Sequence, residues 1–189
     1  MKLVRVGSCG VLQEGIELGD LVITSGAVRL EATTGFYVHE GYPAVADHGV
    51  VGALVEAAHR LGRPAHVGIT ATAPGFFGAQ GRPIPQLPIR FPELAEEMAR
   101  QRVMNFEMEA SSLLVLAGLA GCRAGVVCTA FAQRTSGRFV DPDEQGRAEA
   151  TLIEVGLEAL SILAKMDEAM DAAGAAYWRP SLWASMTAP

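Results

Sequence analysis

Residues 123–132 read Arg-Ala-Gly-Val-Val-Cys-Thr-Ala-Phe-Ala, and this almost wholly apolar run decides the fold class. A strand that is apolar on both faces is typical of a sheet covered by helices on both sides. A similar strand is expected at 65–72, and helical spacing of apolar residues over 50–61 precedes it. Alternating strands and helices indicate an α/β fold with a mixed, mostly parallel central sheet, three-layered and flanked by helices.

The other elements follow from the same periodicities and from the turn residues between them. We expect further strands at 2–6, 20–30 and 103–107, and helices at 92–101, 110–120 and 142–170. The first strand is expected to end in a turn at 7–10, which holds two glycines. Residues 73–92 form a loop rich in proline and glycine. A loop that long in a compact domain is usually functional or disordered.

Composition narrows the class of protein further. The chain has 189 residues, 50% hydrophobic, with a net charge of −6. We expect one domain at 1–170 and an aromatic tail at 171–189. The negative charge argues against nucleic acid as the partner, and no apolar stretch reaches membrane-spanning length. Three cysteines without a CxxC motif fit a reducing, cytoplasmic location, and no metal-ligand spacing is present.

One candidate site motif is Asn105-Phe106-Glu107-Met108-Glu109. In extended backbone, residues two apart point to the same face, so Glu107 and Glu109 are expected to project together. A carboxylate only accepts hydrogen bonds, and it can therefore hold both hydroxyls of a ribose diol. The plainer alternative is that these acids are solvated or favour the start of the following helix.

A second motif lies in the long loop. Gln80 and Arg82 offer a planar amide and a planar guanidinium, which suit the edge of a flat heterocycle, and Phe76 can stack on its face. In α/β sheets ligands bind beyond the carboxyl ends of the strands, where Gly7-Ser8 and 133–135 are also expected. A sugar clamp beside a base-reading pair predicts a nucleoside site.

On these motifs the chain resembles the nucleoside phosphorylases of the purine and uridine phosphorylase superfamily, most closely uridine phosphorylase. The resemblance covers about residues 3–165. The matching stretches are Arg5-Val-Gly-Ser8-Cys-Gly10, Gly19-Asp20-Leu-Val-Ile-Thr, Pro43-Ala-Val-Ala-Asp47, Phe76 with Gln80-Gly-Arg82, Val103-Met-Asn-Phe-Glu107-Met-Glu109-Ala-Ser, Arg123-Ala-Gly-Val-Val and Gln133-Arg134-Thr135.

The resemblance implies phosphorolysis of a uridine-like nucleoside to ribose 1-phosphate and free base, in nucleoside salvage and catabolism. It implies inorganic phosphate as co-substrate, no cofactor or metal, and a dimer-based homo-oligomer such as a hexamer. The resemblance also implies a role for each site residue. Phosphate would be bound by Arg5, Gly7 and Ser8, and the ribose by Glu107, Met108 and Glu109. The base would be bound by Phe76, Gln80, Arg82 and Arg134, and the implied catalytic residues are Arg82, Gln80 and Arg5.

Alternatives remain open at this point. A related nucleosidase would use water in place of phosphate, and a non-catalytic subunit would only bind nucleosides. Purine-directed relatives carry a Ser-Asp pair after the last strand, whereas residues 132–135 read Ala-Gln-Arg-Thr, with no acid before Asp141. This favours a pyrimidine.

The family domain normally begins well before the first strand of this chain. The part not present holds a glycine-rich turn with an arginine of the phosphate site, and strands of the sheet. We therefore expect the strand at 2–6 to have an exposed edge, an aggregation hazard unless it is covered. Either another chain supplies the missing part, or the start is truncated, or the product is not a competent enzyme.

Overall fold

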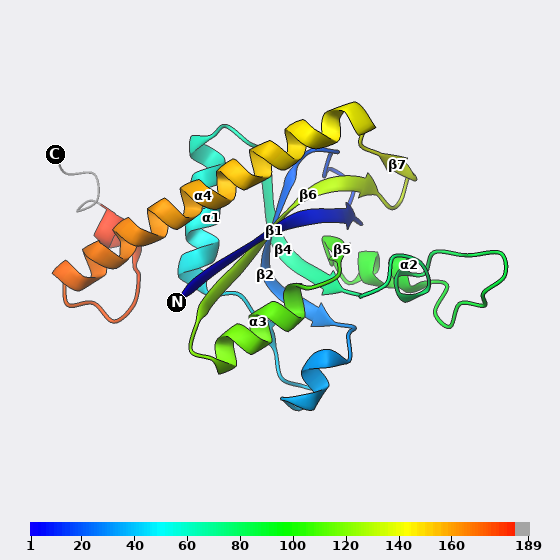
Figure 1. The fold of residues 1–189 in the computed structure, drawn as a ribbon, viewed down its shortest axis with the longest axis horizontal. Helices are drawn as coiled ribbons and strands as arrows, with labels where there is room; N and C mark the ends of the chain where they lie inside the picture. Colours follow the sequence, from blue (N-terminus) through cyan, green and yellow to red (C-terminus); the bar gives the residue numbers. More distant parts are fainter. Residues whose placement is uncertain (184–189) are drawn as a thin grey trace.

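The computed structural model describes residues 1–183, whose arrangement is shown in Figure 1. The strands are β1 (Lys2–Val11), β2 (Leu21–Arg29), β3 (Ala44–Val45), β4 (Ala65–Thr72), β5 (Asn105–Glu107), β6 (Arg123–Gln133) and β7 (Arg138–Phe139). The helices are α1 (His48–Arg60), α2 (Leu94–Arg100), α3 (Ala110–Leu119) and α4 (Pro142–Ala172), with short 3-10 turns at Thr33–Phe36, Gly78–Gln80 and Pro180–Leu182.

The strands form one sheet in the order β3-β2-β4-β5-β1-β6-β7, and a further pairing of β2 with β6 closes the five inner strands into a ring. The long ladders β1–β6 and β2–β4 are parallel, as is β4–β5. The pairings β1–β5 and β2–β6 are antiparallel. The predicted mixed α/β fold is confirmed. The ring closure was not predicted, because it joins strands that are far apart in the sequence.

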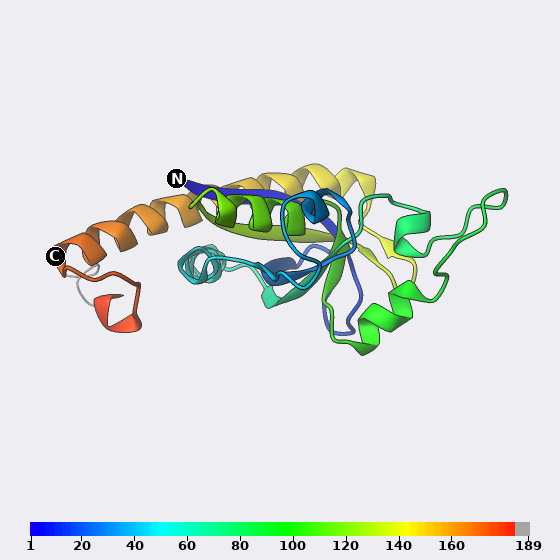
Figure 2. The same ribbon diagram turned by 90° about the horizontal axis from the view of Figure 1, so that it is seen from below.

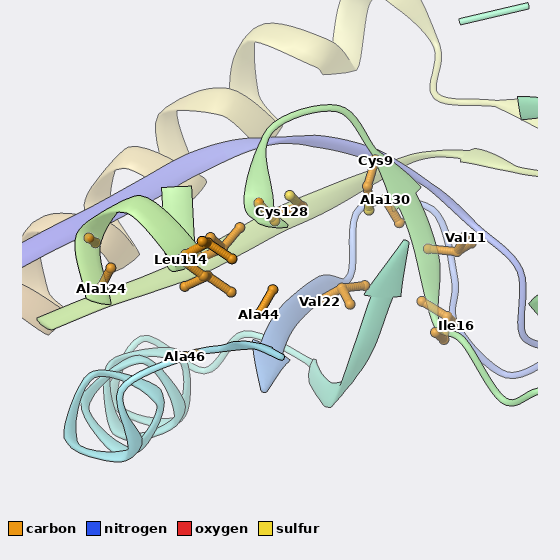
Figure 3. Packing of buried hydrophobic residues seen from close by; sticks show 14 residues of the cluster. Cys9, Val11, Ile16, Val22, Ala44, Ala46, Leu114, Ala124, Cys128 and Ala130 are labelled. Carbon is orange, nitrogen blue, oxygen red and sulfur yellow. The ribbon is translucent and has the colours of Figure 1, made fainter. Parts of the chain in front are cut away.

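Side-chain alternation along β6 explains how helices cover the sheet on two sides. Val126 and Cys128 face a cluster that includes Leu114 of α3, part of which is shown in Figure 3. Val127 between them faces the opposite cluster, where α1 and α4 pack against each other. Successive residues of a strand point to opposite faces, so one apolar strand serves both layers. Figure 2 shows the long α4 running past the end of the sheet.

The predicted turn at 7–10 is wrong, since β1 continues to Val11. Ser8 pairs with Thr129 and Cys9 with Ala130 on β6, and only a local irregularity interrupts the ladder between Cys9 and Gly10. The glycines of this stretch do not adopt positive φ. They therefore do not turn the chain, and extended backbone carries this segment past the candidate site.

The end of the described chain packs against the body of the protein. α4 runs to Ala172, two residues past the expected domain limit at 170, and Asp141 caps its start by accepting a hydrogen bond from Asp143 N at 2.9 Å. Trp178 and Trp183 meet edge-on, with ring centroids 5.9 Å apart, against the α1–α4 cluster. The rest of the predicted tail, 184–189, lies outside the described residues. Within 1–183, no helix is both long and apolar enough to cross a membrane.

Candidate active site

A cavity of about 460 Å³ opens where β1, β5 and β6 meet the loop after β4. It brings together nine of the ten predicted site residues, namely Arg5, Gly7, Ser8, Phe76, Gln80, Arg82, Glu107, Met108 and Glu109. The tenth, Arg134, lies behind the wall of the cavity and contacts Gln80. Segments from four separate parts of the sequence thus meet at one cavity.

Arg5 is the charged centre of one end of the cavity. Its guanidinium forms an ion pair with Glu109 and lies 3.5 Å from the Oε2 atom of Glu107. It also donates to Cys128 Sγ at 3.3 Å. Burial by itself lowers the pKa of Arg5, but the interactions with Cys128, Glu107 and Glu109 outweigh it and raise the pKa above its usual value. Arg5 is therefore held as a cation at the cavity wall.

The absence of a side chain at Gly7 allows the close approach of Arg5. A Cβ atom placed on Gly7 would lie 2.6 Å from the Nη1 atom of Arg5 and 3.0 Å from its Cζ atom. The guanidinium therefore packs directly over the main chain of β1. Ser8, the next residue, is exposed and lines the same end of the cavity.

Glu107 is buried, and both oxygens of its carboxylate accept hydrogen bonds from other groups of the chain. Oε1 accepts a hydrogen bond from Thr72 Oγ1 at 2.6 Å, and Oε2 accepts from the main-chain N–H groups of Glu109 and Ala110, each at 2.8 Å. These N–H groups belong to the start of α3, where no main-chain acceptor precedes them. Glu107 therefore binds the α3 terminus to strand β4.

The expectation that Glu107 and Glu109 project together from extended backbone is wrong in its geometry. β5 ends at Glu107, and Glu109 is the N-cap of α3 with φ −138° and ψ −17°. Both carboxylates nevertheless approach Arg5. Only Glu109, whose side chain is 55% exposed, has a carboxylate open to a ligand. Met108 between them is partly exposed, and its sulfur accepts from Gly75 N at 3.4 Å.

Two further arginines lie near Gly10 of β1, where Arg82 lines the cavity and Arg134 stands beside it. The Arg82 guanidinium lies 4.2 Å from the centre of the Phe76 ring and 5.6 Å from that of Phe139. Its Nε atom is buried without a hydrogen-bond partner among the described residues. Arg134 donates to the side-chain and main-chain oxygens of Gln80 at 3.1 and 2.8 Å. Neither arginine has an ion pair with a carboxylate within residues 1–183.

The electrostatics of these arginines favour an anion. Burial lowers the pKa of Arg82. Burial, and to a lesser extent repulsion from Arg82, lowers the pKa of Arg134 to about 10, with Glu96 acting in the other direction. Neither group forms an ion pair with a carboxylate in the described chain, and the more distant Glu96 only partly offsets the positive charge of Arg134. Negative charge that developed on a ligand here would be stabilised by preorganised donors.

Gln80 has a more structural position than the sequence indicated. Its side chain is buried, its Nε2 donates to Ala73 O at 3.2 Å and its Oε1 accepts from Arg134. The amide therefore fixes the loop and orients Arg134.

Sequence reasoning missed several residues of the site. Thr72 links Glu107 to α3, since its Oγ1 also accepts from Ser111 N at 2.8 Å. The cavity is further lined by Cys9, Gly10, Phe106, Phe131, Ala132, Phe139 and Gln145. Phe131 could have been predicted from the sequence as a site residue, because it lies just before Gln133-Arg134-Thr135 at the end of an apolar strand. Phe139 and Gln145 could not have been predicted, since their positions depend on how β7 and α4 return to the sheet.

No group of three or more histidine, cysteine, aspartate or glutamate side chains suited to a metal ion occurs within residues 1–183. The lining of the described cavity offers charged groups, hydrogen-bond donors and aromatic rings.

Comparison with known proteins agrees with this geometry. The family model described as phosphorylase superfamily matches residues 1–170. A uridine phosphorylase from Thermococcus kodakarensis is 47% identical over 183 residues, which cover 95% of this chain and 64% of that protein. A uridine phosphorylase from Escherichia coli is 33% identical over 159 residues, covering 82% of this chain and 63% of that protein.

A DeoD-type purine nucleoside phosphorylase from a Jannaschia species is 30% identical over 158 residues, 83% of this chain and 63% of that protein. The chain thus spans less than two thirds of the length of these relatives. The match of the family model over most of the chain leads to one conclusion. The chain belongs to the phosphorylase superfamily.

Proposed function

We propose that this chain carries the nucleoside-binding part of a phosphorylase that cleaves a uridine-like pyrimidine nucleoside with inorganic phosphate. The observation that carries the proposal is the distribution of charged side chains along the cavity. Arg5 and Glu109 stand at one end, and Arg82, free of any acidic partner in the described chain, stands at the other. The similarity to proteins named uridine phosphorylase supports the same activity.

The proposed reaction exchanges one bond at C1′ of the sugar. The C1′–N bond breaks and its electron pair leaves with the base, while a phosphate oxygen forms a new bond to C1′. The sugar passes through an oxocarbenium-like state, as in glycoside cleavage generally. Arg82 would meet the charge that develops on the pyrimidine oxygens, with Gln80 and Arg134 shaping this wall and Phe76 covering the ring face. The departing base then takes a proton from solvent.

The other end of the cavity would hold the phosphate and the sugar. Arg5, Gly7 and Ser8 would bind phosphate, and Glu109 the ribose diol, with Met108 beside the sugar. Glu107 would support this end by holding the α3 terminus. Pyrimidine preference rests on the absence of an acid in residues 132–135, where purine-directed relatives carry one.

Partners and location are part of the proposal. Phosphate carries nearly two negative charges, while Arg5 is the one cation at its end of the described cavity lining. A homo-oligomer or a second polypeptide that adds donors would complete the site.

We place this activity in the cytoplasm, because three cysteines without a disulfide framework suit a reducing compartment.

The purified 189-residue chain, assayed with uridine in the presence and absence of phosphate, tests the proposed reaction. Uracil released only with phosphate supports phosphorolysis. Equal release without phosphate would identify a nucleosidase. Saturable uridine binding without product, both from the chain alone and from its assembly with a completing polypeptide, would identify a non-catalytic subunit. Inosine at the same concentration serves as the control for base choice, and we expect it to react more slowly.

Replacing Glu109 with glutamine is expected to weaken ribonucleosides more than 2′-deoxyribonucleosides. A charge-assisted hydrogen bond contributes roughly 1.5–3 kcal/mol, so kcat/KM for uridine should fall by about 10- to 100-fold more than that for 2′-deoxyuridine. The loss of the Arg5–Glu109 pair affects both substrates alike, and the difference between them therefore isolates the 2′-hydroxyl. Equal losses would count against a diol contact.

Replacing Gly7 with alanine is expected to raise the KM for phosphate by about tenfold, or ~1.4 kcal/mol. The added methyl group would displace the Arg5 guanidinium, which lies 2.6 Å from the Cβ position. Gly118→Ala is the matched control, because a Cβ there meets nothing within 4 Å. An unchanged KM for phosphate in Gly7→Ala would show that the position of Arg5 does not matter for phosphate.

A further inference from the structure

Two of the three cysteines, Cys9 and Cys128, lie together beside Arg5. In the β1–β6 ladder Cys128 pairs with Gly7, and Cys9 lies two residues further along β1. Residues two apart on a strand share a face, so both thiols point to the side of the sheet that α3 covers. Figure 3 shows both cysteine side chains within the buried cluster on that side.

The two thiols interact with each other and with two polar groups around them. Burial, and then a hydrogen bond with the Cys128 thiol, raise the pKa of Cys9 well above its usual value. Arg5 Nη1 donates to Cys128 Sγ at 3.3 Å. The amide of Asn105 favours the thiolate form of Cys9, and its Nδ2 atom is buried without a hydrogen-bond partner in the described chain. A cation and an unused N–H donor therefore stand beside the sulfur atoms, where they would stabilise negative charge.

The register of the two cysteines does not suit a disulfide. Diagonal neighbours in a sheet have Cα atoms about 7–8 Å apart. That separation is at or beyond the distance that a disulfide bridges without movement of the backbone. Both residues are free thiols in the structure. Two sulfur atoms on a shared face with this offset can instead hold one metal ion between them.

A pair of thiolates selects a soft metal ion that needs few ligands. Thiolates favour Cu(I), whereas Zn²⁺ in proteins is almost always held by four ligands. Within residues 1–183, the side chains of histidine, cysteine, aspartate and glutamate form no group of three or more suited to a metal. Cu(I) bound by two thiolates carries one net negative charge. Arg5 would neutralise this charge, and the Asn105 N–H would donate to a sulfur.

We propose that Cys9 and Cys128 form a binding site for Cu(I), with two sulfur ligands, that is reached from the catalytic cavity. Cys9 lines this cavity, and Cys128 is fully buried behind it. On binding, the two S–H bonds break, two Cu–S bonds form and two protons pass to solvent, while copper keeps its oxidation state. Arg5 is the counter-ion of the resulting complex.

One consequence of this site concerns phosphate. Arg5 is also the cation assigned to phosphate, so Cu(I) and phosphate would each weaken the binding of the other. This consequence rests on the proposed function, whereas the Cu(I) site itself rests only on the geometry of the two thiols and their neighbours.

The test is Cu(I) binding by the purified 189-residue chain under anaerobic conditions, in competition with the chromogenic chelator bicinchoninate. We expect the parent chain to withhold one Cu(I) ion from the chelator, with two sulfur neighbours in copper X-ray absorption. Arg5→Gln should lower the affinity by about 10- to 100-fold, the range typical of groups that support a metal ligand. Cys9→Ser and Cys128→Ser should each lower it by more than about 100-fold, since each removes a ligand.

Cys122→Ser is the matched control and should keep the parent affinity, because Cys122 is a free, partly exposed cysteine outside the pair. Circular dichroism checks that each variant is folded, and Cys9→Ala or Cys128→Ala replaces a serine variant that is not. The proposal would be overturned by a parent chain that retains no Cu(I), or by folded Cys9 or Cys128 variants with unchanged affinity. An equal loss in Cys122→Ser would also overturn it. None of these readouts requires turnover, so the Cu(I) site and the proposed phosphorolysis succeed or fail separately.

Discussion

Replacing Arg82 with alanine is expected to lower kcat/KM for uridine phosphorolysis by about 30- to 1000-fold, or roughly 2–4 kcal/mol of transition-state stabilisation. The guanidinium lies near the rings of Phe76 and Phe139 and has no carboxylate partner among the described residues. Its charge therefore remains available for the negative charge that develops on the leaving pyrimidine. A donor fixed before the reaction needs no reorganisation during it.

The measurement is steady-state kinetics with uridine at saturating phosphate, in whichever assembly shows turnover. Arg90→Ala provides a matched control, because Arg90 is an exposed arginine of the same loop that stacks on Phe91. The loss in Arg82→Ala should fall mainly on kcat, since the interaction strengthens as charge develops. Turnover within about twofold of the parent chain, the range expected of Arg90→Ala, would remove Arg82 from the mechanism.

Replacing Glu107 with alanine is expected to lower the free energy of unfolding by about 3–5 kcal/mol. The change removes the acceptor for Thr72 Oγ1 and for two main-chain N–H groups at the start of α3, all within a buried region. It also leaves Arg5 with one carboxylate in place of two. Buried donors without partners account for most of the expected loss.

Urea denaturation followed by circular dichroism measures this difference. Glu109→Ala is the control, because that side chain is 55% exposed and its ion pair with Arg5 is open to solvent on one side. Exposed ion pairs contribute about 0–1 kcal/mol, so Glu109→Ala should unfold close to the parent chain. Similar midpoints for the two variants would show that Glu107 does not stabilise α3.

Much of the fold was predictable from local pattern alone. The strand expected at 65–72 is β4 with the same limits, and the helices expected at 110–120 and 142–170 are α3 and α4 to within two residues at each end. These elements have clear apolar periodicity, and their ends have recognisable signals such as Asp141 before Pro142. Nine of the ten candidate residues also met at one cavity, because they lie on or just after strands of the same sheet.

The expectations that the structure contradicts concern features that depend on contacts between segments far apart in the sequence. The two glycines at 7 and 10 suggested a turn, but the ladder with β6 holds them extended. Gln80 resembled a free base-reading amide, but Arg134, far along the chain, occupies its oxygen. The pairing of β2 with β6 that closes the ring had no local signal.

The sequence by itself thus determined the type of most elements, the fold class and nine of the side chains or main-chain positions that line the cavity. Only the tertiary structure decided that Glu107 is buried as an acceptor while the carboxylate of Glu109 stays open to solvent. The physical reason is the distance along the sequence over which each kind of interaction acts. Periodicity and capping act within a few residues of the chain. Burial, ion pairing and strand order depend on contacts between segments that are more than a hundred residues apart, such as Arg5 with Glu109.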